Sequence, residues 1–274
     1  MTIDAVEQQT LLYLIALVEP DQAALRTVAE LTPEPGVRLE AFENLAAVVR
    51  EVPASMFTGD DAEDRLADVA WLAPHAEAHD SVLRALLEAG VSTWPSGFGS
   101  VFTTREALAS RVASCAEHAA EYFDLVRGSH EWSLRIYADR ATIKRAVQPT
   151  KASEATSGAD YLRKKQGRSS LDAALEERAL ALVDTALDAL EPTTVDIAER
   201  PVLETDENEG WQIAHIALLI DKTNQGSFDE ALDQVAETLE PLGLRFTLSG
   251  PWPSYSFCPR VGEGADAPGL EHST

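Results

Sequence analysis

The sequence predicts an α+β protein made of two domains, each with ferredoxin-like (βαββαβ) topology and additional helices. Two observations predict this class. Short apolar or alternating segments, typical of strands, are separated by segments with the three- and four-residue spacing of amphipathic helices. The order strand, helix, strand, strand, helix, strand then occurs in each half of the chain, although no residue-level repeat accompanies it. A chain of 274 residues is long enough for two ordinary domains.

The first half contains the elements of one such domain. Strands are expected over 11–18, 37–42, 45–52 and 91–102, and helices over 20–31 and 63–89. Glu43 and Asn44 suit a tight hairpin between the second and third strands. Pro74 should break or restart the second helix, because a proline inside a helix removes a hydrogen bond. Gly90 should end that helix.

A further helix, over residues 105–127, should follow the first domain's last strand. Its apolar residues recur every three or four positions and predict a buried stripe of Leu108, Val112, Cys115, Ala119, Tyr122 and Val126. Gly128 should end the helix. We therefore expect an N-terminal domain over 1–129, a C-terminal domain over 130–260 and a loose tail over 261–274.

The second half has the same alternation of elements. Strands are expected over 131–138, 194–200, 211–220 and 244–250, and helices over 139–147, 170–190 and 227–243, with a polar loop over 151–161. The first strand alternates and should be half-buried. The third is apolar on both faces, which indicates a central position in its sheet. The last helix should bury Phe228, Leu232, Val235, Leu239 and Leu242.

The chain is strongly acidic, with 46 acidic against 22 basic residues and a net charge of −24 at pH 7. Such a charge repels nucleic-acid phosphates and anionic lipid headgroups, so we expect neither nucleic acid nor a membrane as partner. No apolar run approaches the roughly 20 residues of a membrane helix, and the N-terminus does not resemble a signal peptide. Two cysteines are too few for a disulfide framework. We expect a cytoplasmic protein.

No motif predicts a catalytic, cofactor-binding or metal-binding residue. His75 and His79 have the i, i+4 spacing of metal ligands, but they do not form H-E-x-x-H. Because His79 shares a helical stripe with apolar residues, a structural role is favoured, and His215 is expected in the core of its strand. Cys115 lies on the buried stripe, and nothing near Cys258 in sequence would activate its thiol.

Basic residues are concentrated between Arg140 and Arg168. The cluster holds eight of the 22 basic residues: Arg140, Lys144, Arg145, Lys151, Arg163, Lys164, Lys165 and Arg168. It is either a solvated helix face with a loop or a docking patch for an acidic partner. We take Arg163, Lys164 and Lys165 as candidate partner-binding residues.

An aromatic segment near the C-terminus, Ser249–Phe257, reads SGPWPSYSF. Gly250 and Pro251 should end the last strand, since proline offers no N–H to a sheet. The segment either folds back over the core of the second domain or displays stiffly held aromatic residues to an apolar partner. Trp252, Tyr255 and Phe257 are the candidate binding residues.

Five motifs occur in a characteristic order along nearly the whole chain. They are LLYLIALV (11–18), FGSVF (98–102), GSHEWSLRIY (128–137), SGADYLRKKQ (157–166) and LSGPWPSYSF (248–257). Together they resemble the gas vesicle GvpL/GvpF family. The resemblance implies two α+β domains in which ferredoxin-like topology recurs. It also implies a non-enzymatic, minor gas vesicle component that is needed for assembly and uses no cofactor.

The partners implied are the small hydrophobic shell protein and other accessory gas vesicle proteins. One position departs from the family, which usually has a basic residue just before the Phe-Gly of FGSVF. Gly97 stands there in this chain, preceded by Ser96, so any contact made by that cation is absent or supplied elsewhere. The alternative function is a ferredoxin-like small-molecule-binding or oxygenase-type protein, because a fold does not settle a function.

Overall fold

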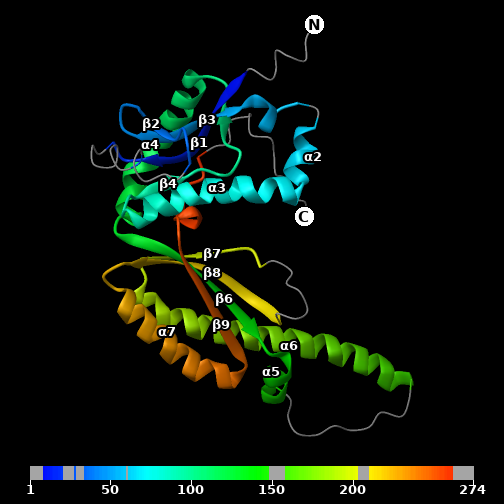
Figure 1. Cartoon of the computed structure of the whole chain (residues 1–274). Helices are drawn as coiled ribbons and strands as arrows, with labels where there is room; N and C mark the ends of the chain where they lie inside the picture. Colours follow the sequence, from blue (N-terminus) through cyan, green and yellow to red (C-terminus); the bar gives the residue numbers. More distant parts are fainter. Residues whose placement is uncertain are drawn as a thin grey trace. The chain divides into compact units, whose positions relative to one another are not determined.

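The computed structural model describes residues 9–20, 28, 34–59, 61–147, 158–202 and 210–261, and for residues 146, 147 and 158–171 it describes the backbone alone. The chain divides into two compact units, Met1–Gly128 with Trp252–Thr274, and Ser129–Pro251 (Figure 1). It therefore passes from one unit to the other twice. Residues 252–260, which we expected in the C-terminal domain, group with the first unit.

The first unit contains one antiparallel sheet. Its strands are β1 (Thr10–Val18), β2 (Arg38–Ala41), β3 (Ala46–Pro53), β4 (Thr93–Pro95) and β5 (Val101–Phe102). The order is β2-β3-β1-β4, and β5 also pairs with β1. The expected hairpin joins β2 to β3, where the Phe42 amide donates to the Leu45 carbonyl at 2.9 Å. The helix expected over 20–31 lies outside the described residues, apart from Pro20 and the helical Val28.

The expected last strand of this unit is two short strands with a turn between them. Ser100 donates through its hydroxyl to the Gly97 carbonyl at 2.8 Å and closes the turn. Gly99 has a φ of +87°, which favours glycine. The turn brings the chain back to β1, so that β4 pairs with residues 16–18 and β5 with residues 12–13.

The helical elements of the first unit are η2 (Ala54–Met56), α2 (Ala62–Ala67), α3 (Val69–Glu88), α4 (Arg105–Val126) and η5 (Tyr255–Phe257). The expected break at Pro74 is wrong, because α3 runs through it and the interruption lies at Asp68. The Asp68 side chain accepts from the Ala70 amide at 2.9 Å and caps α3. Pro74 lies in the first half of α3, and the rings of Trp71 and His75 stack with their centroids 4.1 Å apart.

The end of α3 agrees with the expectation for Gly90. Gly90 has a φ of +75°, and its amide donates to the Leu87 carbonyl at 3.0 Å. The Val91 amide donates to the Leu86 carbonyl at 2.9 Å. These two bonds form a Schellman motif, which satisfies carbonyls at the end of the helix.

Side chains from both faces of β1 are buried in the first unit. Tyr13 and Ile15 join the core formed with α3, whereas Leu14 and Leu17 lie on the side of α4. The predicted α4 stripe is confirmed, since all six of its residues are buried. The sheet is therefore covered on two faces, as expected for a strand as apolar as β1.

The second unit contains a second sheet, in the order β7-β8-β6-β9. Its elements are β6 (Ser129–Ala138), α5 (Arg140–Val147), α6 (Gly158–Leu190), η3 (Glu191–Thr193), β7 (Asp196–Glu199), β8 (Trp211–Asp221), α7 (Gln225–Leu239), η4 (Glu240–Leu242) and β9 (Leu244–Trp252). The central position predicted for β8 is confirmed, and α6 and α7 cover one face of the sheet (Figure 1). Both units combine an antiparallel sheet with helices, so the α+β class is confirmed.

Several boundaries in the second unit differ from the sequence expectation. Helix α6 begins at Gly158, so the end of the expected loop is helical. Leu242 is exposed because α7 stops at Leu239 and a short 3-10 helix carries Leu242 outward. Strand β6 was expected to be half-buried, but both of its faces contain buried side chains, including those of Glu131 and Ser133. Strand β9 continues through Pro251 to Trp252, and Pro251 is tolerated because β9 is an edge strand.

Within the described residues, none of the helices has a stretch long and apolar enough to cross a membrane.

Candidate functional site

The C-terminal segment, Trp252–Val261, is held against the first unit by buried hydrogen bonds. Tyr122 of α4 is 1% exposed, and its hydroxyl lies 2.9 Å from the Thr93 carbonyl and 3.3 Å from the Ser254 carbonyl. The Cys258 thiol lies 3.6 Å from the same hydroxyl. A residue of the buried α4 stripe therefore anchors the segment to the unit that contains β4.

His79 of α3 provides a second anchor. Its Nδ1 lies 2.7 Å from the Tyr13 hydroxyl, and because Nε2 faces the Ser96 carbonyl, which can only accept, we assign the ring proton to Nε2. Nε2 lies 3.1 Å from the Ser96 carbonyl and 3.2 Å from the Tyr255 hydroxyl. Burial lowers the pKa of His79 to about 4, and it raises the pKa of Tyr13. At neutral pH His79 is thus an uncharged link between β1, the β4–β5 turn and the C-terminal segment.

Aromatic rings surround this link. Phe98 lies 6.1 Å from both the Tyr13 and the His79 ring, and Phe57 stacks on Tyr13 at 5.6 Å between ring centroids. The Gly99 backbone acts against the rise in the pKa of Tyr13 that burial causes. Three of the five motifs that we quoted from the sequence, residues 11–18, 98–102 and 248–257, consequently meet around His79.

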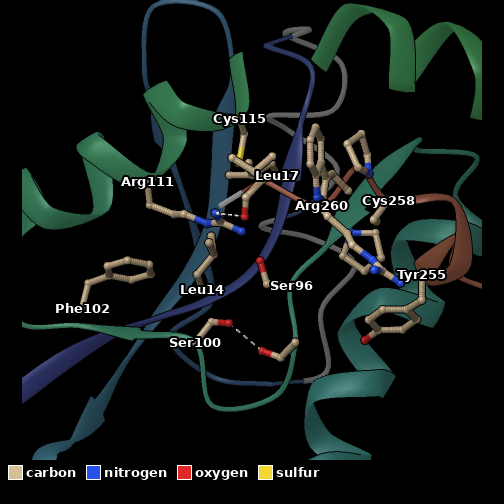
Figure 2. Close-up of a pocket in the computed structure, with 15 residues that line it drawn as sticks. Leu14, Leu17, Ser96, Ser100, Phe102, Arg111, Cys115, Tyr255, Cys258 and Arg260 are labelled. Carbon is tan, nitrogen blue, oxygen red and sulfur yellow. Dashed lines mark hydrogen bonds between the residues drawn. The ribbon is translucent and has the colours of Figure 1, made fainter. Parts of the chain in front are cut away.

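A pocket of about 720 Å³ opens on the α4 side of the first unit (Figure 2). Its floor is apolar and includes the buried Leu14, Leu17 and Trp94. Arg111 reaches it from α4 and Arg260 from the C-terminal segment. Of the fifteen described residues that line it, none is acidic. The pocket is also lined by Gly97, so its cationic side chains are Arg111 and Arg260 and not a residue at position 97.

The motif at 128–137 lies against the strand part of the 248–257 motif within the second unit. Gly250 of β9 lies against β6, where an added Cβ would come within 3.0 Å of the Trp132 ring and 3.1 Å of the Glu131 carbonyl oxygen. Glu131 is 1% exposed and lies 3.7 Å from the Arg200 guanidinium. His215 is buried, as expected, and its Nε2 lies 2.9 Å from the Ser133 hydroxyl.

The predicted aromatic residues differ in their exposure. Trp252 and Tyr255 are 38% and 37% exposed, whereas Phe257 is half-buried. The possibility that the segment covers the second domain's core is wrong, because Trp252–Val261 groups with the first unit. The two exposed rings remain candidates for partner binding.

The basic cluster is described in part. Arg163, Lys164 and Lys165 belong to α6, of which the structure describes only the backbone at these positions. Lys151 lies outside the described residues. The Arg140 guanidinium lies 4.2 Å from the Trp211 ring centroid. Arg145 donates to the Thr142 hydroxyl at 3.0 Å. Arg140 and Arg145 thus make contacts inside their own unit.

The two histidines with metal-ligand spacing have different partners. His75 stacks on Trp71, and its Nδ1 lies 2.6 Å from the Trp71 carbonyl, while both nitrogens of His79 face other groups. Within the described residues, no three His, Cys, Asp or Glu side chains gather as a metal site. Burial raises the pKa of the Cys115 thiol, which keeps it protonated at neutral pH.

Sequence analysis missed Arg111, Tyr122 as an anchor, and Arg260. Tyr122 was recognised only as a stripe residue. Arg111 precedes a stripe residue, and Arg260 lies at the edge of the expected tail. Their common position at one pocket depends on the return of residues 252–261 to the first unit, which has no local sequence signal.

Comparison with known proteins finds relatives among gas vesicle proteins. The chain is 26% identical over 253 residues to gas vesicle protein L of Streptomyces sp., covering 89% of this chain and 91% of that protein. It is 24% identical over 266 residues to gas vesicle protein L2 of Halobacterium salinarum, covering 91% of each.

Two crystal structures share the fold. GvpF from Anabaena sp. PCC7120 aligns with a TM-score of 0.68 at 17% identity, over 92% of this chain and 97% of that one. GvpF from Microcystis aeruginosa aligns with a TM-score of 0.61 at 18% identity, over 91% of this chain and 99% of that one. The family model for the gas vesicle synthesis protein GvpL/GvpF matches residues 11–259. Because this match spans most of the sequence, the chain belongs to the GvpL/GvpF family of gas vesicle proteins.

Proposed function

We propose that this protein is a non-enzymatic accessory or minor structural component of the gas vesicle. It acts in vesicle assembly by binding the hydrophobic shell protein and other accessory gas vesicle proteins, in the cytoplasm and at the vesicle. The observation that carries this proposal is the C-terminal segment, which exposes Trp252 and Tyr255 while its backbone is anchored to the first unit.

The anchoring matters because ordering a flexible segment opposes binding. The Ser254 carbonyl lies against the Tyr122 hydroxyl, and the Tyr255 hydroxyl lies against His79. The aromatic rings therefore lose little conformational freedom when a partner covers them. Preformed, exposed aromatic side chains are frequent energetic centres of protein interfaces.

The charge of the chain supports the same role. A shell subunit apolar enough to exclude water would aggregate if its apolar surface stayed exposed. A bound protein with a net charge of −24 would keep the complex dispersed through mutual repulsion. We infer that the chain covers an apolar face of the shell protein before assembly.

We further infer that both units have ferredoxin-like topology. In each sheet the strands follow the order second, third, first, fourth, with β5 added beside β1 in the first unit. The long helices α3 and α7 each precede the fourth strand of their unit, as the βαββαβ order requires. Such a fold offers a rigid support for the C-terminal segment, although it does not itself specify a function.

Co-expression with the small hydrophobic shell protein tests the proposed binding. The double variant Trp252→Ala/Tyr255→Ala should capture at least about tenfold less shell protein, since interface aromatic residues dominate binding energies. Phe257→Ala should have a smaller effect because Phe257 is half-buried. Capture is measured by affinity pull-down from the soluble fraction, and thermal unfolding of each variant shows whether the fold is kept.

Two variants serve as controls for this experiment. Tyr255→Phe keeps the ring but removes the hydroxyl that lies against His79, so it should lose less capture than the double variant. Val69→Ala removes a side chain that is 74% exposed elsewhere in the first unit, and it should retain capture. Unchanged capture by the double variant, with unfolding unaltered, would contradict the role of the segment.

The basic residues of α6 form a separate proposed contact with acidic accessory gas vesicle proteins. Changing Lys164 and Lys165 to Glu should weaken the capture of accessory proteins in the same pull-down, because the charges would then repel an acidic partner. Salt screens exposed charge pairs, so the capture that remains should also depend less on the salt concentration. If this variant and the unaltered chain capture the accessory proteins equally across a salt titration, the contact is removed from the proposal.

A further inference from the structure

We propose that the pocket on the α4 side of the first unit binds the C-terminal residue of a partner polypeptide, with an aliphatic side chain on the floor and the terminal carboxylate at Arg111 and Arg260. The pocket belongs entirely to the first unit. Tyr255 lines this pocket and is also a proposed contact of the shell protein, but the test below changes other residues, so the two proposals are tested separately.

The apolar floor comes from β1, β4 and β5, and most of its side chains are buried. Leu14 and Leu17 of β1 are 2% and 1% exposed, and Trp94 of β4 is 4% exposed. Phe102 of β5 adds a half-buried ring at one side. An aliphatic side chain placed here would be removed from water against a rigid surface. A volume of about 720 Å³ lies within the range of sites that enclose small ligands or short peptide ends.

The charge of the lining differs from that of the chain as a whole. Acidic residues outnumber basic ones 46 to 22 in the sequence, yet the described lining contains two arginines and no carboxylate. Arg111 and Arg260 come from different sides of the pocket (Figure 2). The local preference is therefore for an anion, although the molecule as a whole repels anions.

Both guanidinium groups have hydrogen-bonding capacity to spare. Within the described part of the chain, the Arg111 guanidinium has one hydrogen bond, to the Val261 carbonyl at a long 3.5 Å, and neither Arg111 nor Arg260 forms an ion pair. A guanidinium has five N–H donors, arranged to match the two oxygens of a carboxylate. Ser96, Ser100 and Tyr255 add hydroxyl groups to the lining.

A chain terminus satisfies both features in a single residue. Its carboxylate and its side chain leave the same carbon, so one residue can place a carboxylate among the cationic side chains and an aliphatic group on the apolar floor. An internal Asp or Glu has its carboxylate at the end of its own side chain and would need a neighbouring residue to fill the floor. A free aliphatic acid has the same chemistry, and the test separates it from the peptide.

The test measures binding of the peptide N-acetyl-Ala-Leu-Leu, with a free carboxylate, to the full chain by titration calorimetry. The same peptide with a C-terminal amide is the matched probe, and octanoate is the free acid. We expect the acid peptide to bind at least about tenfold more tightly than the amide, because a charge-assisted pair is lost with the carboxylate. Its affinity should fall as salt is added.

Three variants locate the site. Arg111→Gln and Arg260→Gln should each weaken the acid peptide about tenfold while leaving the amide unchanged. Gly97→Leu should block both probes by filling the pocket, because an added Cβ at Gly97 has nothing within 4 Å and the backbone is unstrained. Gly226→Leu, at a similarly open glycine in the second unit, should leave binding unaltered.

Several results would overturn the proposal. These are equal binding of acid and amide peptides, binding that survives Gly97→Leu, and the absence of any peptide binding. Binding of octanoate without the peptide would assign the pocket to a small aliphatic acid and would also overturn it. A failure of shell-protein capture leaves the proposal unaffected, so the two proposals fail separately.

Discussion

His79 shows how a single side chain connects distant parts of the first unit. Its two ring nitrogens contact Tyr13 of β1, the Ser96 carbonyl and the Tyr255 hydroxyl. Placing a neutral imidazole among these groups satisfies each of them without burying a charge. The histidine that had the spacing of a metal ligand in the sequence is therefore a structural hydrogen-bonding centre.

The lowered pKa of His79 predicts a pH-dependent stability. The unfolded chain takes up a proton near the ordinary value of 6.5, whereas the folded chain does so near pH 4. Between these values the unfolded state binds more protons, so the free energy of unfolding falls as pH falls from 6.5 to about 4 and is unaffected above 6.5. The loss should reach at most about 3 kcal/mol.

Urea denaturation of the full chain at pH 7, 6, 5 and 4 measures this dependence. His79→Gln removes the titrating group and should flatten the curve relative to the unaltered chain, whatever its stability at pH 7. Burial also lowers the pKa of His130 and His215, and these groups contribute to the pH dependence of both proteins. The difference between the two slopes therefore reports the contribution of His79. Identical slopes for the two proteins would contradict the prediction.

At the scale of elements, strand β9 depends on a glycine where it passes β6. Gly250 has a φ of +143°, and a Cβ there would meet both the Trp132 ring and the Glu131 carbonyl oxygen. The close approach belongs to the motifs EWSLRIY and LSGPW, which lie far apart in the sequence. Two of the segments that identify the family are thus neighbouring strands of one sheet.

Gly250→Ala should lower the free energy of unfolding by about 1–3 kcal/mol, because the added methyl group clashes with a backbone that cannot move without breaking the sheet. Gly226→Ala is the matched control. Gly226 lies in α7 with open space around it, so alanine there should raise stability by up to about 1 kcal/mol. Denaturant unfolding monitored by circular dichroism measures both, and equal effects of the two changes would refute the role of Gly250.

At the scale of the whole molecule, the C-terminal segment makes the first unit discontinuous in sequence. Residues 252–261 return to it after the second unit is complete. Their removal should cost Tyr122 its contact with the Ser254 carbonyl and His79 its contact with the Tyr255 hydroxyl, and each lost hydrogen bond lowers stability.

A chain that ends at Pro251 should therefore lose stability in the first unit selectively. Hydrogen exchange followed by mass spectrometry should show faster exchange in α3, α4 and β4, with little change in β6 and β8. Faster exchange confined to β6 and β8 would instead indicate that the segment supports the second unit, as the sequence had suggested.

Local patterns predicted much of the fold, because they depend on neighbours in the sequence. The α4 stripe is buried throughout since helical spacing places its residues on one face. The Gly90 terminus and the Glu43–Asn44 hairpin follow from backbone geometry alone. The expected helix break at Pro74 was wrong. The rule that proline interrupts a helix is local, whereas α3 is stabilised by capping at Asp68 and by packing of its buried face.

The candidate sites were predicted less completely. The aromatic segment was recognisable from its composition, and the motif order was sufficient to indicate the GvpL/GvpF family. The unit that the segment joins was predicted wrongly, and the pocket with Arg111 and Arg260 was not predicted at all. The sequence by itself determined the α+β class, most of the elements and the family, because these depend on local periodicity and ordered motifs. Only the tertiary structure decided which buried groups anchor the C-terminal segment and which cations face one pocket, because those contacts join residues that no local pattern relates.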